Sequence, residues 1–290
     1  MKKITLLIPV YNDWESLIQL LNDINKIILE IKNYQFNCIV INDASTCEMI
    51  NILKPSNLEF LKIINMRKNT GHQRCIAFGV KHIVSNNLSD YVVIMDGDGE
   101  DRPVEIKNFI MRIEKDETKS VVAKRVKRSE GLVFRIFYEV HKVLTLIFTG
   151  KKINFGNFTC LTKTDLKILS EKINLWNNYS GTFKKYILKY NEINSSRGLR
   201  YCGNSKMSFF NLIFHSLSII SVFKYSVFLR SSFFIIILSF LTKYISVYAI
   251  ALQLLLVIFN LMIFVISLRE NKNNFFSCND NTSNEIDVPH

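Results

Sequence analysis

An uncharged stretch near the C-terminus limits what this chain can fold into more than any other feature. Residues 245–268 (ISVYAIALQLLLVIFNLMIFVISL) are 24 residues without a charged side chain, and about 20 apolar residues suffice to span a bilayer as a helix. A preceding stretch of 12 uncharged residues, 231–242, lies between Arg230 and Lys243. If these two side chains reach the headgroups, the shorter stretch also spans. The sequence therefore predicts a transmembrane hairpin over residues 227–268, with one span plus an interfacial helix as the alternative.

The charges beside these stretches predict which side of the membrane the chain occupies. Lys224 and Arg230 precede the pair, Arg269 and Lys272 follow it, and Lys243 is the one charged residue between. Basic flanks stay on the cytoplasmic side, so both flanks are expected there. The chain is then a multi-pass protein of the inner (plasma) membrane.

Two further segments adjoin the hairpin. Residues 207–226 carry Leu212, Leu217 and Ile220 at helical spacing, which predicts an amphipathic helix on the membrane surface. Residues 269–290 are polar and rich in Asn, which predicts a disordered cytoplasmic tail.

Composition and cysteine usage indicate a folded part on the cytoplasmic side. Hydrophobic residues make up 48% and charged residues 21% of the 290 residues, and the net charge is +12; these values exclude wholesale disorder. The six cysteines form no C-x-x-C pair or zinc-like cluster. The N-terminal apolar run is interrupted by Pro9 and does not resemble a signal peptide. We therefore expect reduced cysteines.

Short apolar runs alternate with amphipathic stretches in the first half of the chain. Asn12 and Glu15 have the spacing of a capping box before a helix, and residues 71–84 indicate a second helix. Such alternation is typical of βαβ units. Residues 1–206 are therefore predicted to form an α/β domain with a mostly parallel, Rossmann-like sheet flanked by helices. Strands are predicted at residues 4–9, 36–41, 60–64 and 91–95.

Asp96-Gly97-Asp98 follows a predicted buried strand and is the main indication of chemistry. Open α/β sheets bind ligands at the carboxyl ends of their strands, where carboxylates at i and i+2 can reach one divalent cation. Their hard oxygen ligands suit Mg²⁺ or Mn²⁺, which can bridge the two phosphates of a nucleotide-sugar, and Glu100 could complete the site. A solvated acidic turn is the alternative, but the position directly after YVVIM favours the metal site.

Two other predicted strand ends carry polar residues toward the same edge. Pro9-Val10-Tyr11-Asn12-Asp13 follows the first strand, and Asn42-Asp43-Ala44-Ser45 follows the second. Asp43 could accept a hydrogen bond from a base or ribose, and Tyr11 could pack on the base. The alternative is that Asp43 and Ser45 cap a helix.

Taken in order, LLIPVYND, CIVINDAST, NTGHQRCIAFG and YVVIMDGDGEDRP resemble the glycosyltransferase family 2 domain, which has the GT-A fold. AKRVKR followed by FRIFYEV, then FGNF, then RYCGNSKM before paired apolar segments, resembles the polyprenyl-phosphate sugar transferases. Dolichyl-phosphate mannose synthases and undecaprenyl-phosphate glucosyltransferases belong to that group. The resemblance covers about residues 3–268 and does not identify the sugar.

This resemblance implies roles for individual residues. Arginine side chains grip phosphate oxygens, although a solvated basic face is the alternative for Arg125. Glu100 stands where many members have Gln. The resemblance implies nucleotide contacts for Pro9, Tyr11, Asp13 and Asp43, metal and diphosphate contacts for Asp96, Asp98 and Glu100, acceptor-phosphate contacts for Arg125 and Arg135, and closure over the phosphates for Arg200, Ser205 and Lys206.

The resemblance thus implies a membrane-attached, metal-dependent, inverting glycosyltransferase with a cytoplasmic catalytic domain. Its donor is a nucleotide-sugar and its acceptor a polyprenyl phosphate. Asn157 stands where many members have Asp, and Asn cannot act as a base. A phosphate acceptor is compatible with this difference, because it is already ionised and needs no base. One alternative acceptor is a lipid-linked saccharide or other cell-surface glycan. Another alternative is a non-catalytic module that binds nucleotide-sugars. Membrane lipids are expected partners and nucleic acid is not, and a homo-oligomer is compatible with the sequence.

Overall fold

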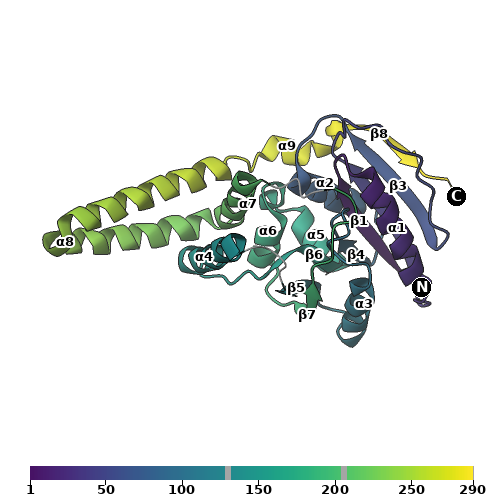
Figure 1. Cartoon of the computed structure of the whole chain (residues 1–290), viewed down its shortest axis with the longest axis horizontal. Helices are drawn as coiled ribbons and strands as arrows, with labels where there is room; N and C mark the ends of the chain where they lie inside the picture. The colour runs from purple at the N-terminus through teal and green to yellow at the C-terminus, as the bar shows by residue number, and fades with distance from the viewer. Residues whose placement is uncertain (128–131, 204–207, 290) are drawn as a thin grey trace.

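The computed structural model describes residues 1–127, 132–203 and 208–289 of the chain. Among these, eight strands form one sheet in the order β7-β5-β6-β4-β1-β2-β3-β8, and helices cover both of its faces (Figure 1). The strands are β1 Lys2–Val10, β2 Tyr34–Asn42, β3 Leu58–Met66, β4 Tyr91–Ile94, β5 Val121–Lys127, β6 Phe155–Thr162, β7 Asn191–Ser196 and β8 Thr282–Asp287. The helices are α1 Trp14–Ile28, α2 His72–Ser85, α3 Glu105–Lys115, α4 Leu132–Thr149, α5 Lys163–Ser170, α6 Tyr179–Tyr186, α7 Phe209–Ser221, α8 Lys224–Ser267 and α9 Lys272–Phe276.

The predicted mostly parallel sheet with flanking helices is confirmed. β1 pairs in parallel with β2 and β4, and β2 pairs in parallel with β3. β1, β2 and β4 are buried on both faces over most of their length, as their apolar sequences require. β6 runs antiparallel to β4 and β5, and β8 runs antiparallel to β3. The sequence did not predict β5 to β8.

Close packing of α2 against β1 sets the geometry beside the site. A Cβ atom at Gly79 would lie 2.3 Å from the Leu7 side chain, so only glycine allows this approach. α2 begins at His72, next to the carboxyl ends of the parallel strands. The parallel arrangement brings the ends of β1, β2 and β4 to one edge of the sheet.

The capping box predicted from Asn12 and Glu15 is wrong. Asp13 occupies the N-cap position of α1 and makes no side-chain capping hydrogen bond. The Asn12 side chain instead accepts from the backbone N–H groups of Thr46 and Cys47, at 2.8 and 3.1 Å. Asn12 therefore ties the loop after β1 to the loop after β2 rather than starting the helix.

The apolar segment forms one long helix, α8, that is broken at Ile245 (φ −132°, ψ 49°). The chain folds back at this break, as hydrogen bonds between the two arms show: Gln253 Nε2 donates to Ser239 Oγ at 2.8 Å and to the Ile235 carbonyl at 3.2 Å. The two arms extend side by side away from the sheet (Figure 1). Within the described ranges, α8 is the one helix long and apolar enough to cross a membrane. Two separate membrane spans are therefore not confirmed.

The helix predicted over residues 207–226 is shorter and less independent than expected. α7 covers Phe209–Ser221 and joins α8 directly, while residue 207 lies outside the described residues. Its C-terminal half packs on α6: Asn178 Nδ2 donates to Ser218 Oγ at 3.1 Å, and Asn177 Nδ2 donates to Ser221 Oγ at 2.8 Å. Phe210 and Phe214, in the N-terminal half, are exposed.

The disordered tail predicted for residues 269–290 is wrong for the part that the structure describes. β8 adds to the free edge of β3, and Lys62 Nζ lies 3.0 Å from Glu285 Oε2. Phe275 of α9 is fully buried and packs against Trp176. Polar composition misled the prediction because an edge strand needs backbone partners more than apolar side chains.

Candidate active site

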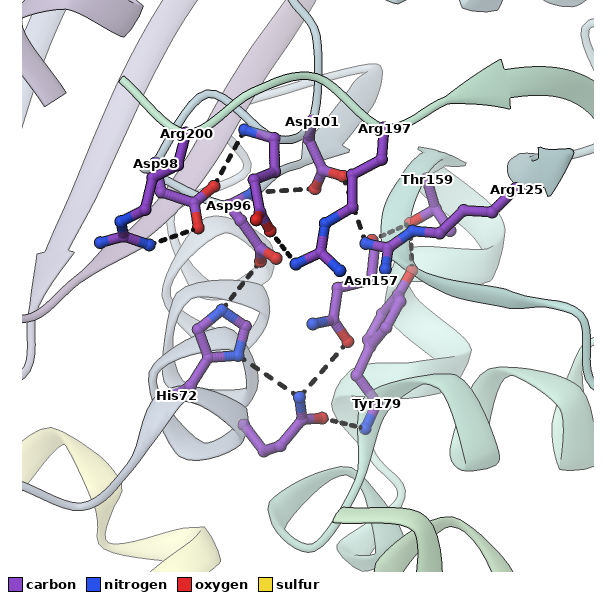
Figure 2. Close-up of polar contacts among 12 residues, drawn as sticks. His72, Asp96, Asp98, Asp101, Arg125, Asn157, Thr159, Tyr179, Arg197 and Arg200 are labelled. Carbon is purple, nitrogen blue, oxygen red and sulfur yellow. Dashed lines mark hydrogen bonds and ion pairs between the residues drawn. The ribbon is translucent and has the colours of Figure 1, made fainter. Parts of the chain in front are cut away.

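The loop after β4, residues 96–101, is the centre of the site (Figure 2). Asp96 Oδ1 lies 2.9 Å from His72 Nε2 at the start of α2. The backbone N–H of Asp96 donates to Asp101 Oδ2 at 3.0 Å, and Arg125 Nη2 of β5 lies 3.5 Å from Asp101 Oδ1. Asp101 is buried, so it fixes the conformation of the loop that presents Asp96.

A second set of ion pairs joins the same loop to residues 197–200. Arg200 Nη1 donates to Asp98 Oδ2 at 2.8 Å, and its Nη2 donates to Asp13 Oδ2 at the end of the loop after β1. Arg197 pairs with Glu100. The structure thus brings together Asp13, Asp98 and Arg200, to which the sequence resemblance had given a nucleotide contact, a metal and diphosphate contact, and closure over the phosphates, respectively.

Burial and mutual repulsion shift the pKa values of the acidic side chains in this loop. Burial, reinforced by the negative charge of Asp96, raises the pKa of Asp98 to about 6. Burial and Asp96 also raise the pKa of Asp101 to about 7. Burial opposes ionisation of Asp96 too, but His72 and Arg125 hold the pKa of Asp96 well below its usual range. Asp96 is therefore the permanently ionised member of the group.

The donor set fits a divalent cation that is held partly by substrate. Among the described residues, no group of three His, Cys, Asp or Glu side chains is arranged to hold a metal. Asp96 and Asp98 offer two carboxylates, two residues apart in one loop and paired with His72 and Arg200, while Glu100 pairs with Arg197. Mg²⁺ in nucleotide sites typically takes one or two carboxylates plus phosphate oxygens and water. Two carboxylates therefore suffice, and Glu100 is not brought into the set.

The predicted nucleotide-binding residues lie along the same edge. Pro9 is paired with Ile41 in the sheet, and Tyr11 is 40% exposed beyond the end of β1. Asp43 is buried, and its two carboxylate oxygens accept the backbone N–H groups of Thr70 and Gly71 at 2.7 and 2.8 Å. Asp43 thus holds the loop before α2, which resembles the capping alternative. A nucleotide contact for Asp43 remains a prediction.

Only one of the predicted acceptor-phosphate residues has a described environment. The Arg125 side chain lies beside Asp101 and above Gly156 of β6. Arg135 falls within α4, but its side chain lies outside the described residues, as do Ser205 and Lys206. Their predicted roles therefore stay predictions.

The side chains after Gly71 separate into two groups. His72 and Gln73 face the site: Gln73 Nε2 donates to Asn157 Oδ1 at 3.3 Å, and Gln73 Oε1 accepts from the backbone N–H of Tyr179 at 2.7 Å (Figure 2). Arg74 turns away and donates to the Thr70 carbonyl at 2.8 Å. Asn157 is therefore held by an amide rather than placed beside a carboxylate.

Three residues of the site could not be predicted from the sequence motifs. Asp101 and Arg197 form ion pairs and hydrogen bonds that hold the loop of residues 96–101. Asp101 is visible in the sequence as the last acid of DGDGED, but the motif does not show its role. His215 of α7 lies near His72, His141, Asp96 and Arg125. Burial, together with the charges of His72 and His141, lowers the pKa of His215 to about 4. The apolar sequence around His215 gave no sign that it belongs to this region.

A mostly parallel sheet with paired carboxylates at its carboxyl edge defines the class of GT-A-like glycosyltransferase folds. Glucosyl-3-phosphoglycerate synthase from Mycobacterium tuberculosis superposes with a TM-score of 0.51 at 13% identity, covering 78% of this chain and 80% of that one. A second solved structure, titled only as a mycobacterial protein, gives 0.52 at 13% identity over 78% of this chain and 75% of that one. These likenesses concern the fold.

The sequence identifies the family within that class. The family model described as "Glycosyl transferase family 2" matches residues 5–174, and the chain belongs to this family.

Two curated proteins are similar to this chain in sequence. Undecaprenyl-phosphate 4-deoxy-4-formamido-L-arabinose transferase of Photorhabdus laumondii is 24% identical over 73% of this chain and 65% of its own length. The uncharacterized glycosyltransferase YkcC of Bacillus subtilis is 28% identical over 58% of this chain and 53% of its own length. The chain therefore spans between about half and two thirds of the length of these relatives.

Proposed function

We propose that this chain is a membrane-attached, metal-dependent, inverting glycosyltransferase that moves a sugar from a nucleotide-sugar to a polyprenyl phosphate. The observation that carries the proposal is the position of the apolar helix α7: its His215 lies within electrostatic range of Asp96 and Arg125, and the helix packs with α4 and α8. Residues 1–206 and the returning tail would form the cytoplasmic catalytic domain. Residues 227–268 would form the membrane anchor.

The geometry of α8 supports a hairpin that enters and leaves the membrane on one side. Lys224 Nζ, at its start, lies 2.9 Å from Glu270 Oε2, just after its end. A single crossing would separate these residues by the full bilayer, so the segment crosses twice or not at all. Each arm has about 20 residues and is about 30 Å long, which matches the hydrocarbon thickness.

α4 supports membrane contact next to the site. Its exposed side chains Val140, Val143, Leu146 and Ile147 are apolar, and the exposed Glu139 precedes them, although an exposed helix face in water is normally polar. Arg230 of α8 donates to the Ile147 carbonyl at 3.0 Å, so this face lies at the base of the hairpin. A lipid-linked acceptor could reach the charged loop along this surface without leaving the membrane.

The charged groups supply the chemistry expected of such a transfer. When bound between Asp96 and Asp98, a divalent cation would neutralise the charge that develops on the leaving nucleoside diphosphate; the mycobacterial synthase named above was solved with Mn²⁺ and UDP-glucose. Arg125 would orient the acceptor phosphate for in-line attack on the anomeric carbon. Asn157 cannot act as a base, which a phosphate nucleophile does not require.

Separate measurements of donor and acceptor binding test the proposal. We expect Arg135→Ala to weaken transfer by roughly 2–4 kcal/mol, comparable to breaking a desolvated charge pair, and Arg125→Ala to act in the same direction. Calorimetric affinity for UDP or GDP with Mn²⁺ should change little in both variants. Arg112→Ala, which removes an arginine bound to Asn191 outside the site, is the matched control.

The opposite result would overturn the lipid-phosphate acceptor. If Arg125→Ala and Arg135→Ala abolish nucleotide binding but leave saturation by undecaprenyl phosphate unchanged, these arginines belong to the donor site. A lipid-linked saccharide or other glycan would then be the better acceptor.

A further inference from the structure

We propose that Arg200 is a built-in counter-ion: it pairs with the Asp13 and Asp98 carboxylates until the donor binds, and then with the diphosphate of the donor. This inference rests on the proposed function and assigns Arg200 the task of coupling metal binding to nucleotide binding. It would make the site take up the metal weakly until the nucleotide is present.

Residues 197–203, which we call the strap, lie directly on the metal-binding loop. The backbone N–H of Gly198 donates to the Glu100 carbonyl at 2.8 Å, and that of Tyr201 donates to the Asp98 carbonyl at 3.0 Å. The Tyr201 ring covers Gly99, whose φ of +87° and lack of a side chain allow this contact. The strap is therefore docked by its backbone, independently of its charged side chains.

Arg200 projects from the strap between two carboxylates of different loops. It contacts Asp98 at 2.8 Å through Nη1 and Asp13 through Nη2, and its side chain is 14% exposed. Asp98 and Asp13 are similarly shielded, at 16% and 17%. The guanidinium thus neutralises two acids that would otherwise repel each other.

A divalent cation must compete with this guanidinium for Asp98. The competition ends when a diphosphate arrives, because phosphate oxygens give a guanidinium a bidentate partner of higher charge. Arg200 can then leave Asp98 while its backbone hydrogen bonds keep the strap in place. Metal and nucleotide consequently favour each other's binding by the same factor.

Removing the guanidinium should therefore strengthen binding of the metal alone. In Arg200→Gln, Asp13 and Asp98 lose the cation between them and attract another. In Arg200→Lys the positive charge is kept, so affinity for the metal alone should stay near that of the parent protein. This pair of variants separates the effect of charge from any effect on folding.

Electron paramagnetic resonance titration with Mn²⁺ tests this on the full chain in detergent, without nucleotide and then with UDP or GDP. We expect Arg200→Gln to bind Mn²⁺ alone at least fivefold more tightly than the parent, and to lose most of the gain that nucleotide gives the parent. Arg112→Gln, which removes the same charge outside the site, should match the parent.

Two outcomes would overturn different parts of the account. Unchanged or weaker Mn²⁺ binding by a thermally stable Arg200→Gln, in a parent that does bind Mn²⁺, would exclude the counter-ion role. Failure of every variant and of the parent to bind Mn²⁺, with or without nucleotide, would overturn the metal-dependent function itself.

Discussion

The two ends of this molecule differ in whether their side chains find partners within the protein. At the carboxyl edge of the sheet, Asp96, Asp98, Glu100 and Asp101 each contact a basic side chain from another segment. On the helical extension, large apolar side chains such as Phe240 and Tyr248 are 76% and 75% exposed. The acids at the edge are paired within the protein, whereas many apolar side chains of the extension are not covered by it. The two regions should therefore respond to different substitutions.

The largest expected effect lies at the charged edge. Asp98→Asn should lower transfer by roughly a thousandfold or more, about 4 kcal/mol, because the cation loses a charged ligand. Its thermal stability should stay near that of the parent. Turnover measured beside thermal melting checks this, and Asp116→Asn, the same change in an exposed ion pair with Lys119, is the control. Full turnover in a folded Asp98→Asn protein would exclude the metal assignment.

The second prediction concerns the topology of the helical extension. A cysteine at Lys243, beside the break in α8, should react with an impermeant maleimide on intact cells, and one at Ser283 only after permeabilisation. The difference should be at least tenfold. Ser283 is the better reporter of the tail because Cys278 is buried, and Cys47→Ser removes the exposed native thiol. Equal labelling at both positions would contradict the membrane hairpin.

A smaller effect is expected where the two regions meet. Leu146→Glu places a charge on the exposed apolar face of α4 and should raise the KM for undecaprenyl phosphate about tenfold, as expected for about 1.4 kcal/mol of lost apolar burial. Nucleotide affinity should not change. Leu188→Glu, at a 77% exposed position of the catalytic domain, is the matched control. Identical behaviour of the two variants would exclude membrane contact by α4.

The last prediction is a pH dependence of the free energy of unfolding, caused by His215 of α7, where the catalytic domain meets the helical extension. Burial lowers the pKa of His215 from 6.5 to about 4. The unfolded chain takes up a proton below pH 6.5 while the native imidazole stays neutral, so the free energy of unfolding should fall as pH drops from 6.5 to 4.

The charged neighbours of His215 are His72, His141, Asp96 and Arg125. His215→Gln should reduce the acid loss by roughly 1–2 kcal/mol, as measured by denaturant unfolding at several pH values. An unchanged slope in His215→Gln would assign the acid loss to other groups.

The regions also differ in how much of them the sequence predicts. The parallel strands and Asp96 with Asp98 follow from local patterns, because a buried strand needs continuous apolar residues and its end carries the polar ones. Arg197 was missed because its partner Glu100 lies in another segment, and Asp101 was missed because its bond to the Asp96 backbone N–H depends on the folded conformation of the loop. β8 was missed because its stability comes from backbone pairing with β3, which leaves no apolar pattern. Asn12 was misassigned because its partners lie more than thirty residues away in the sequence.

The most direct test of the central claim is transfer of labelled sugar into the organic phase. The purified full chain would be incubated with a panel of radiolabelled nucleotide-sugars, Mn²⁺ or Mg²⁺, and undecaprenyl phosphate. The account predicts label in the organic phase for at least one donor, only with metal, and none with Asp98→Asn. Label that enters only a lipid-linked saccharide or water-soluble glycan, with undecaprenyl phosphate inert for every donor, would contradict it.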